Sequence, residues 1–245
     1  MNDFDLASSL AIVLLAAACH ASFQLSISML TLLSGHALGR QTAHLRLMRL
    51  VGSFILGAGI MTVLLLSFIA LILGVLLPAK TPLPVWAAYA GGVIGVGVSV
   101  WLFYFRREPG TTLWVPRSFA RFLGDRAKAT KNSAEAFGLG LTSIISELLF
   151  AFAPIAIAAL VLVQLEPKWQ LIGILLYAGV SLLPLLIVGI LIGGGHKLSR
   201  IQQWREANKN FLQFVAGSGL IVLGAYIYVE RVLATAIAAV TGGQS

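Results

Sequence analysis

Two ionisable side chains stand inside stretches that are apolar enough to cross a lipid bilayer. Glu147 lies near the middle of GLTSIISELLFAFAPIAIAAL, residues 140–160, and His20 lies in CHASFQLSISMLTLLSGH, residues 19–36. A charged side chain at the centre of a membrane helix costs about 2.5–3.5 kcal/mol on insertion scales and usually serves transport or proton transfer. We therefore interpret Glu147 as a cation ligand or proton carrier. His20 is its candidate partner, because an imidazole can bind a metal ion or relay a proton.

Each of these residues belongs to a polar stripe on one helical face. His20 and Gln24 are four residues apart and share a face, and so do Ser143, Ser146 and Glu147. We expect the two stripes to line one pathway through the membrane. The candidate binding residues are His20, Gln24, Ser28, Ser143, Ser146, Glu147 and Pro154.

A structural explanation stays open for these residues. Glu147 can be a neutral carboxyl group that is hydrogen-bonded to a neighbouring Ser or Gln, and His20 can be a polar clasp between two spans. Pro154 frees a backbone carbonyl, which either coordinates a cation or accompanies a packing kink. Glu147 and His20 are the candidate metal ligands, although a divalent metal site normally contains several carboxylates and the spans contain one.

The composition is that of an integral membrane protein. Of the 245 residues 58% are hydrophobic and 11% are charged, and the mean hydropathy is +0.93, whereas soluble domains carry about 25% charged residues. The net charge of +8 does not indicate nucleic-acid binding, because the basic residues lie in loops between apolar segments. The single cysteine, Cys19, excludes an internal disulfide. The acidic N-terminus lacks the basic region of a signal peptide, so we expect the first span to be retained.

Six windows are long enough to span a membrane as helices, since about 20 apolar residues are needed for each. Basic residues gather between them: 14 of the 17 Lys and Arg lie in the connections 39–49, 106–135 and 195–209. The positive-inside rule places these connections in the cytoplasm. We therefore predict a multi-pass protein of the inner membrane with both termini outside. The predicted spans are about 9–38, 50–77, 84–105, 136–164, 170–194 and 210–234.

The two halves of the chain carry traces of a repeat. GVIGVGVSVWLF, residues 92–103, aligns with GLIVLGAYIYVE, residues 219–230, so that Gly97 meets Gly224. Small residues at such spacing also let helices pack closely, so packing alone can explain part of the match. The predicted fold is all-α, with six transmembrane helices as two inverted three-helix repeats. The halves are residues 1–105 and 136–245, joined by a basic cytoplasmic connection at 106–135. Within it RSFARFLGDRAKATKN, residues 117–132, is either an amphipathic helix on the membrane surface or a solvated loop.

Three segments resemble known families of membrane proteins. SELLFAFAPIAIAAL, residues 146–160, resembles the second signature of TerC-type proteins: Glu147 takes the first acidic place, and Ala153 stands where the second acidic residue would be. YAGVSLLPLLIVGIL, residues 177–191, resembles the fifth span of the CcdA/DsbD thiol-electron carriers. The Pro-Cys pairs of those carriers are absent, and Ala21 stands at the first cysteine place. His20-Ala21 resembles the start of the His-Ala signature of nickel/cobalt transporters, without the acidic residue and second His that follow in that family.

All three families belong to or resemble the lysine-exporter (LysE) superfamily, whose members are two inverted three-helix halves. The resemblance implies that fold and a transport function. We expect a secondary transporter or exporter for a small cation, with a divalent metal as one candidate, coupled to protons through Glu147. One alternative is an amino-acid or small-solute exporter, and another is a non-transporting membrane subunit. No nucleophile–base pair indicates an enzyme, and no cofactor or nucleic-acid partner is expected. The expected partners are the bilayer and the transported solute, with self-association left open.

Overall fold

The computed structural model is all-helical over the residues that it describes, and no strand occurs among them. The helices are α1 (Asp3–Ser22), α2 (Ser26–Ala37), α3 (Ala43–Leu76), α4 (Leu83–Phe105), α5 (Arg117–Ala129), α6 (Ser133–Leu162), α7 (Pro167–Gly193) and α9 (Lys209–Ile227), which a π-helix, η1 (Tyr228–Leu233), continues. The described residues are 3–22, 26–37, 43–78, 81–105, 117–195, 200, 203–204 and 207–237.

Four helices are long and apolar enough to cross a membrane, and the number rises to six if each of two bent pairs is one span. The four are α3, α4, α7 and α9 with η1. The first bent pair joins α1 to α2 at an angle of 47°, and the second joins two halves of α6, Ser133–Leu148 and Ala151–Leu162, at 91°. The expected all-helical membrane fold is confirmed at this level. The first and fourth predicted spans are each broken near the middle.

Proline chemistry explains the bend in α6. Pro154 lies inside this helix, and a proline ring clashes with the carbonyl four residues earlier and cannot donate to it. That carbonyl belongs to Phe150, in the break between the two halves of α6. Sharp kinks occur characteristically at such positions, so Pro154 accounts for where α6 bends; Pro184 lies inside α7, which runs as one span without such a bend.

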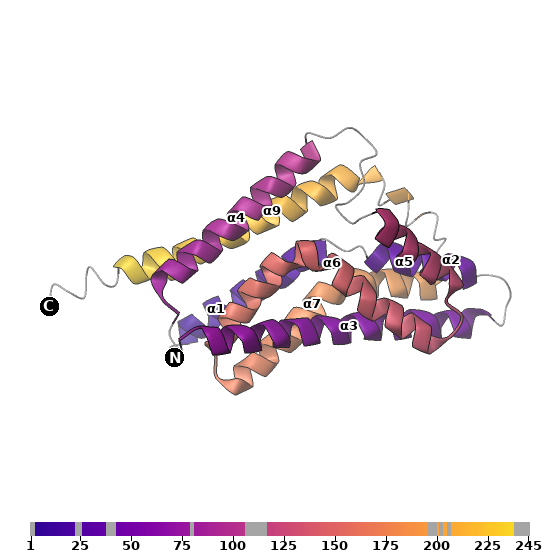
Figure 1. The fold of residues 1–245 in the computed structure, drawn as a ribbon, viewed down its shortest axis with the longest axis horizontal. Coiled ribbons are helices and arrows are strands. Elements are labelled where there is room, and N and C mark those ends of the chain that lie inside the picture. Colours follow the sequence, from indigo (N-terminus) through magenta and orange to yellow (C-terminus); the bar gives the residue numbers. More distant parts are fainter. Residues whose placement is uncertain are drawn as a thin grey trace.

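The helices form two layers (Figure 1). In one layer α1 packs against α6 and α7, and α3 packs along α6; α4 and α9 pack together as the second layer. Glycines allow the closest approaches, because a Cβ at Gly57 of α3 would collide with the carbonyl of Phe137, and one at Gly140 of α6 with that of Phe54. Gly97 of α4 lies against α9 in the same way.

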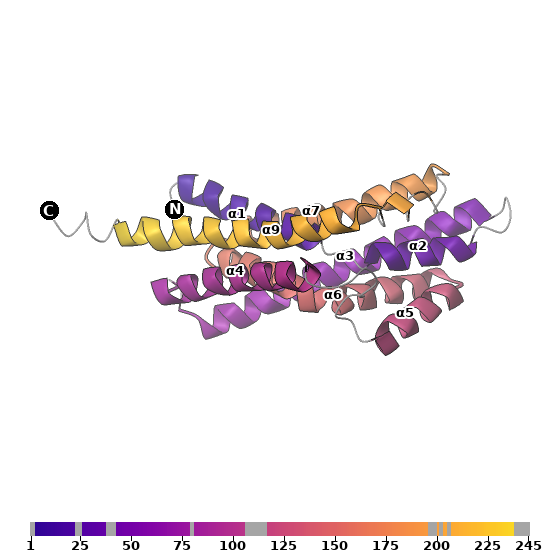
Figure 2. The ribbon, with the colours of Figure 1, turned by 90° about the horizontal axis from the view of Figure 1, so that it is seen from above.

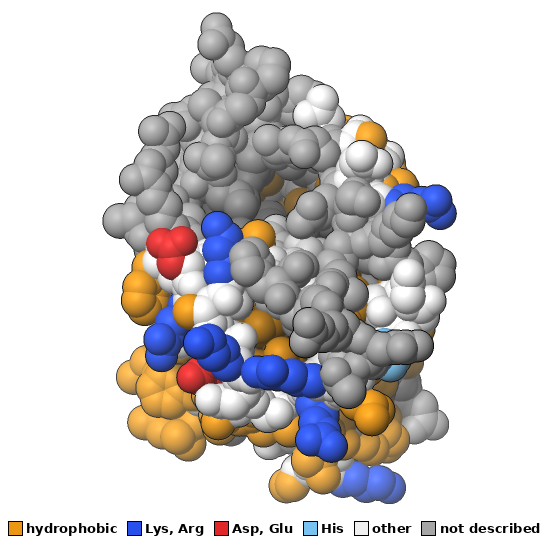
Figure 3. Space-filling view, turned by 90° about the vertical axis from the view of Figure 1, so that its right-hand side faces the viewer, with side chains coloured by type: hydrophobic (Ala, Val, Ile, Leu, Met, Phe, Trp, Pro, Cys, Tyr) orange, Lys and Arg blue, Asp and Glu red, His pale blue; other side chains and the backbone are white. Residues whose placement is uncertain are grey.

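The described parts of the three basic connections lie at one end of the molecule, with α2 and α5 (Figure 1). Figures 1 and 2 show the start of α1 and the end of η1 at the opposite end. The amphipathic segment is helical as α5, which packs against α2 and α6 and buries Ala127. Figure 3 views the basic end, where Lys and Arg side chains gather. The described and exposed members are Arg46, Arg49, Arg126, Lys128, Lys131 and Arg200.

At the other end Arg231 of η1 connects three helices. Its guanidinium donates to the Ser9 hydroxyl of α1 at 2.5 Å and lies 5.5 Å from the ring centre of Trp86 on α4. An arginine held over an aromatic ring in this way contributes a cation–π interaction. The contact ties the second helix layer to α1 at the end remote from the basic connections.

Two apolar clusters fill the interior, one toward each end. The cluster at the basic end contains Leu30 of α2, Phe54 of α3 and Leu185 of α7, and the other contains Ile12 of α1 and Ile155 of α6. Where one cluster meets the other, α1 and α3 each carry one buried residue with a polar group, and α6 and α7 carry two each. We call these residues the polar layer: His20, Thr62, Ser143, Glu147, Tyr177 and Ser181.

Candidate functional site

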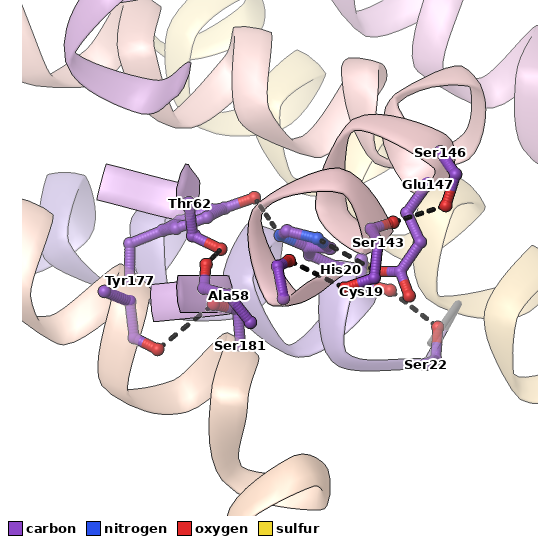
Figure 4. A network of polar contacts seen from close by, with 12 residues as sticks. Cys19, His20, Ser22, Ala58, Thr62, Ser143, Ser146, Glu147, Tyr177 and Ser181 are labelled. Atoms are coloured by element: carbon purple, nitrogen blue, oxygen red, sulfur yellow. Dashed lines mark hydrogen bonds and ion pairs between the residues drawn. The ribbon is translucent and has the colours of Figure 1, made fainter. Parts of the chain in front are cut away.

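His20 is the centre of the polar layer. It lies in the last turn of α1 and is 2% exposed. Its Nδ1 atom is 3.0 Å from the hydroxyl of Tyr177 on α7, and its Nε2 atom is 4.0 Å from Oε2 of Glu147 on α6. Figure 4 shows the imidazole between the tyrosine and the carboxylate. Three helices thus contribute one continuous row of titratable groups.

Glu147 is 1% exposed, so both members of the His20–Glu147 pair are removed from water. The carboxylate stands one residue before the end of the first half of α6, and His20 stands two residues before the end of α1. The last carbonyls of a helix carry partial negative charge. The C-terminal end of α1 therefore lies beside the pair and favours a positive charge there, whereas α6 bends beyond Glu147 without ending.

The serine and threonine hydroxyls around the pair share one hydrogen-bonding pattern. Each donates its proton to a carbonyl three or four residues earlier in its own helix, as helical Ser and Thr commonly do. Because a hydroxyl has one proton and two lone pairs, its oxygen then acts as an acceptor toward its other neighbours. The bonds are Ser143 to Gly140 at 2.8 Å, Thr62 to Ala58 at 3.0 Å, Ser181 to Ala178 at 3.1 Å, Ser146 to Ser143 at 2.5 Å and Ser22 to Cys19 at 2.6 Å.

The predicted site is assembled in part. The structure brings His20, Glu147 and Ser143 together from α1 and α6, and Ser146 is half-buried beside them (Figure 4). Ser28 is half-buried on α2, across the break from His20, and its carbonyl accepts the Thr31 hydroxyl at 2.8 Å. The prediction for Gln24 falls outside the described residues.

Pro154 lies one turn beyond the bend of α6 and is buried. Its contribution to the site is the bend itself, which follows Leu148, one residue after Glu147. Pro154 has no N–H to donate to the backbone carbonyl of Phe150, four residues earlier. That this freed carbonyl coordinates a cation stays a prediction.

Three members of the polar layer were missed from the sequence: Thr62, Tyr177 and Ser181. A signal was present for two of them, because Tyr177 and Ser181 are four residues apart in an otherwise apolar span and so share a face. Their position opposite His20 depends on how α7 packs against α1, which the sequence pattern does not contain.

A metal centre built from several acidic, imidazole or thiol groups is absent from the described part of the chain, where no group of three or more His, Cys, Asp or Glu side chains could hold an ion. Cys19 does not add to the pair. A Cβ placed on Gly219 of α9 would lie 3.0 Å from its sulfur, so the thiol packs toward the second layer. The metal set predicted from the sequence thus remains His20 and Glu147, two ligands.

Comparison of the chain with models of protein families, with curated proteins and with solved structures finds no match. The resemblances to the TerC, CcdA/DsbD and nickel/cobalt transporter families therefore remain predictions from short motifs.

Proposed function

We propose that the protein is a secondary transporter that moves a small cation across the membrane in exchange for protons, with Glu147 as the coupling group. The observation that carries the proposal is the His20–Glu147 pair, 4.0 Å apart and almost fully buried at the ends of two broken helices. Ionisable groups so placed are costly and mark ion pathways or proton relays in membrane proteins.

The surroundings of the pair support an alternating-access mechanism. Apolar clusters close the polar layer toward both ends of the molecule, as in an occluded intermediate from which neither aqueous side is reached. Transporters of several folds place their ion sites near the bilayer midplane, where discontinuous helices meet. Here α1 with α2 is one such discontinuous pair, and the two halves of α6 are the other.

The helix packing is compatible with two inverted three-helix halves, which we include in the proposal. Exchanging the halves maps α1 with α2 onto α6, α3 onto α7 and α4 onto α9 with η1. The contact of α3 with α6 then corresponds to that of α7 with α1, and the contact of α4 with α9 maps onto itself. The broken helices also correspond to each other. The charge asymmetry of the connections supports an inner-membrane orientation with both termini outside.

Reconstituted transport tests the proposal. Proteoliposomes containing a pH-sensitive dye are exposed to a panel of cations and amino acids, and solute-driven proton movement is measured together with protein yield and melting temperature. We expect Glu147→Gln to fold and to lose proton-coupled transport, since glutamine keeps the size and hydrogen bonding but cannot release a proton. Glu147→Asp should keep part of the activity.

Glu135→Gln is the matched control, because it neutralises an exposed carboxylate at the start of the same helix. It should transport normally. Full coupled transport by Glu147→Gln would end the proposal and leave Glu147 as an interhelical hydrogen-bonding residue. A wild-type protein that moves no solute of the panel would favour the non-transporting membrane subunit.

A further inference from the structure

We infer that the polar layer binds a monovalent cation through oxygen acceptors, and that each cation displaces one proton from Glu147 so that the exchange is electroneutral. This inference rests on the proposed function and names its substrate class. Hard alkali ions and small organic cations such as guanidinium share the required chemistry, namely a single positive charge that oxygen atoms can surround.

The hydrogen bonds of the polar layer favour a ligand of positive charge. Ser143, Thr62 and Ser181 donate their protons to carbonyls of their own helices, so their oxygens meet a ligand as acceptors. The hydroxyl of Tyr177 and Nδ1 of His20 are engaged with each other at 3.0 Å. An anion would face acceptors and a carboxylate. An amino acid would bring its own carboxylate into the same surroundings, whereas a cation is favoured by the hydroxyl oxygens and by the carboxylate.

The backbone adds to the same preference. The C-terminal end of α1 lies beside His20, and the bend of α6 lies beside Glu147. The last carbonyls of α1 carry partial negative charge, and half-helix C-terminal ends coordinate Na⁺ or H⁺ in transporters with broken helices. Side chains and backbone thus present the same sign of potential to a ligand.

The charge of the ligand follows from the single carboxylate. Glu147 supplies one negative charge to the layer, and a neutral His20 supplies none. One bound monovalent ion is then fully balanced, whereas a divalent ion would leave one charge uncompensated between two apolar clusters. An unpaired charge in a low-dielectric interior is strongly disfavoured. Ca²⁺ sites contain six to eight oxygen ligands, several of them carboxylates as a rule.

The exchange step balances in atoms and charge. With no cation bound, the Glu147 carboxyl holds its proton and the layer is neutral. Binding of the cation breaks the O–H bond, the proton leaves to the aqueous side on which the layer is open, and the ionised carboxylate pairs with the cation. The layer is neutral in both states, so one cation crosses for one proton and no net charge moves.

Proteoliposomes with an imposed pH gradient test both stoichiometry and selectivity. Na⁺, K⁺, Li⁺, guanidinium, Mg²⁺, Ca²⁺ and lysine are added separately, and each is repeated with the membrane potential set by valinomycin. K⁺, which valinomycin carries, is instead measured at potentials set by a gradient of a membrane-permeant anion such as thiocyanate. We expect at least one monovalent cation to dissipate the pH gradient at a rate that does not depend on the membrane potential. The divalent ions and lysine should have no effect.

Release of the gradient by a divalent ion or by lysine, or a rate that follows the potential, would overturn the inference while leaving proton-coupled transport in place. No response to any solute would overturn the proposed function as well.

Ser143→Ala removes one acceptor oxygen and should raise the KM for the cation about tenfold with little change in kcat. Ser99→Ala is the matched control, because Ser99 makes the same bond to its own helix, to Gly95 at 2.7 Å, on the exposed side of α4. Equal KM values for the two variants would remove Ser143 from the ligand set and overturn the acceptor model.

Discussion

Replacing Gly97 by alanine should loosen the contact between α4 and α9. A Cβ at this position would lie 2.9 Å from the carbonyl oxygen of Gly217 and 3.1 Å from the backbone nitrogen of Ile221. Ordinary carbon contacts are about 3.5–4.0 Å long, so the helices must separate by roughly half an ångström. Backbone atoms cannot rotate away as a side chain can. Overpacking of this kind costs about 1–3 kcal/mol.

Gly95→Ala provides the reference for that free energy. Gly95 lies two residues away on the same helix, and a Cβ there would have nothing within 4 Å. Both replacements gain the same helix propensity, about 1 kcal/mol for Gly to Ala, so their difference isolates the packing cost. Gly224→Ala repeats the test on α9, where a Cβ would lie 2.8 Å from the carbonyl oxygen of Ala90.

Thermal unfolding of the purified variants in detergent measures the effect. A chain of this size shifts by about 2–4 °C per kcal/mol, so Gly97→Ala should melt about 2–12 °C below Gly95→Ala. Equal melting temperatures for the two variants would refute the close approach of α4 and α9 and with it the two-layer arrangement.

The remaining predictions concern the site, one helix start and the topology. Tyr177→Phe keeps the ring and removes the hydroxyl that holds Nδ1 of His20; it should cost about 0.5–1.5 kcal/mol of stability and slow coupled transport, and unchanged transport would show that the tyrosine does not orient the imidazole toward Glu147. Asn132→Ala should destabilise the start of α6 by about 1 kcal/mol, because the Asn132 side chain accepts the backbone N–H of Glu135 at 2.9 Å; a melting curve that matches the wild type would contradict this. Reporter proteins that are active only in the periplasm or only in the cytoplasm, fused in turn to the C-terminus, should show the C-terminus outside, and activity of the cytoplasmic reporter alone would reverse the predicted orientation.

The glycines aligned between the two halves of the chain differ in how they pack in the structure. The alignment paired Gly97 with Gly224, and both glycines lie where α4 and α9 touch. Gly92 was aligned with Gly219 on the same grounds, yet a Cβ at Gly92 would meet nothing within 4 Å, and Gly219 faces Cys19 of α1. Close packing of one helix pair accounts for the first match, so the inverted repeat needs the support of helix arrangement and stays a prediction.

The sequence by itself determined the features that depend on neighbouring residues. Hydrophobic runs predicted the membrane helices, and the spacing of Ser143 and Glu147 correctly placed them on one buried face of α6. Pro154 indicated where that helix is disturbed, because a proline acts on a carbonyl only four residues away. These signals are local, since helix geometry relates each residue to those within two turns.

Only the tertiary structure decided which faces meet. Tyr177 is 157 residues from His20 along the chain, and their hydrogen bond exists because α7 packs against α1. Thr62 on α3 is brought into the same layer by the crossing of α3 and α6, which requires glycine at both Gly57 and Gly140. The spacing of residues along one helix predicts that a face is polar. It does not predict which helix packs against that face, because the packing depends on the shapes of all the helices together.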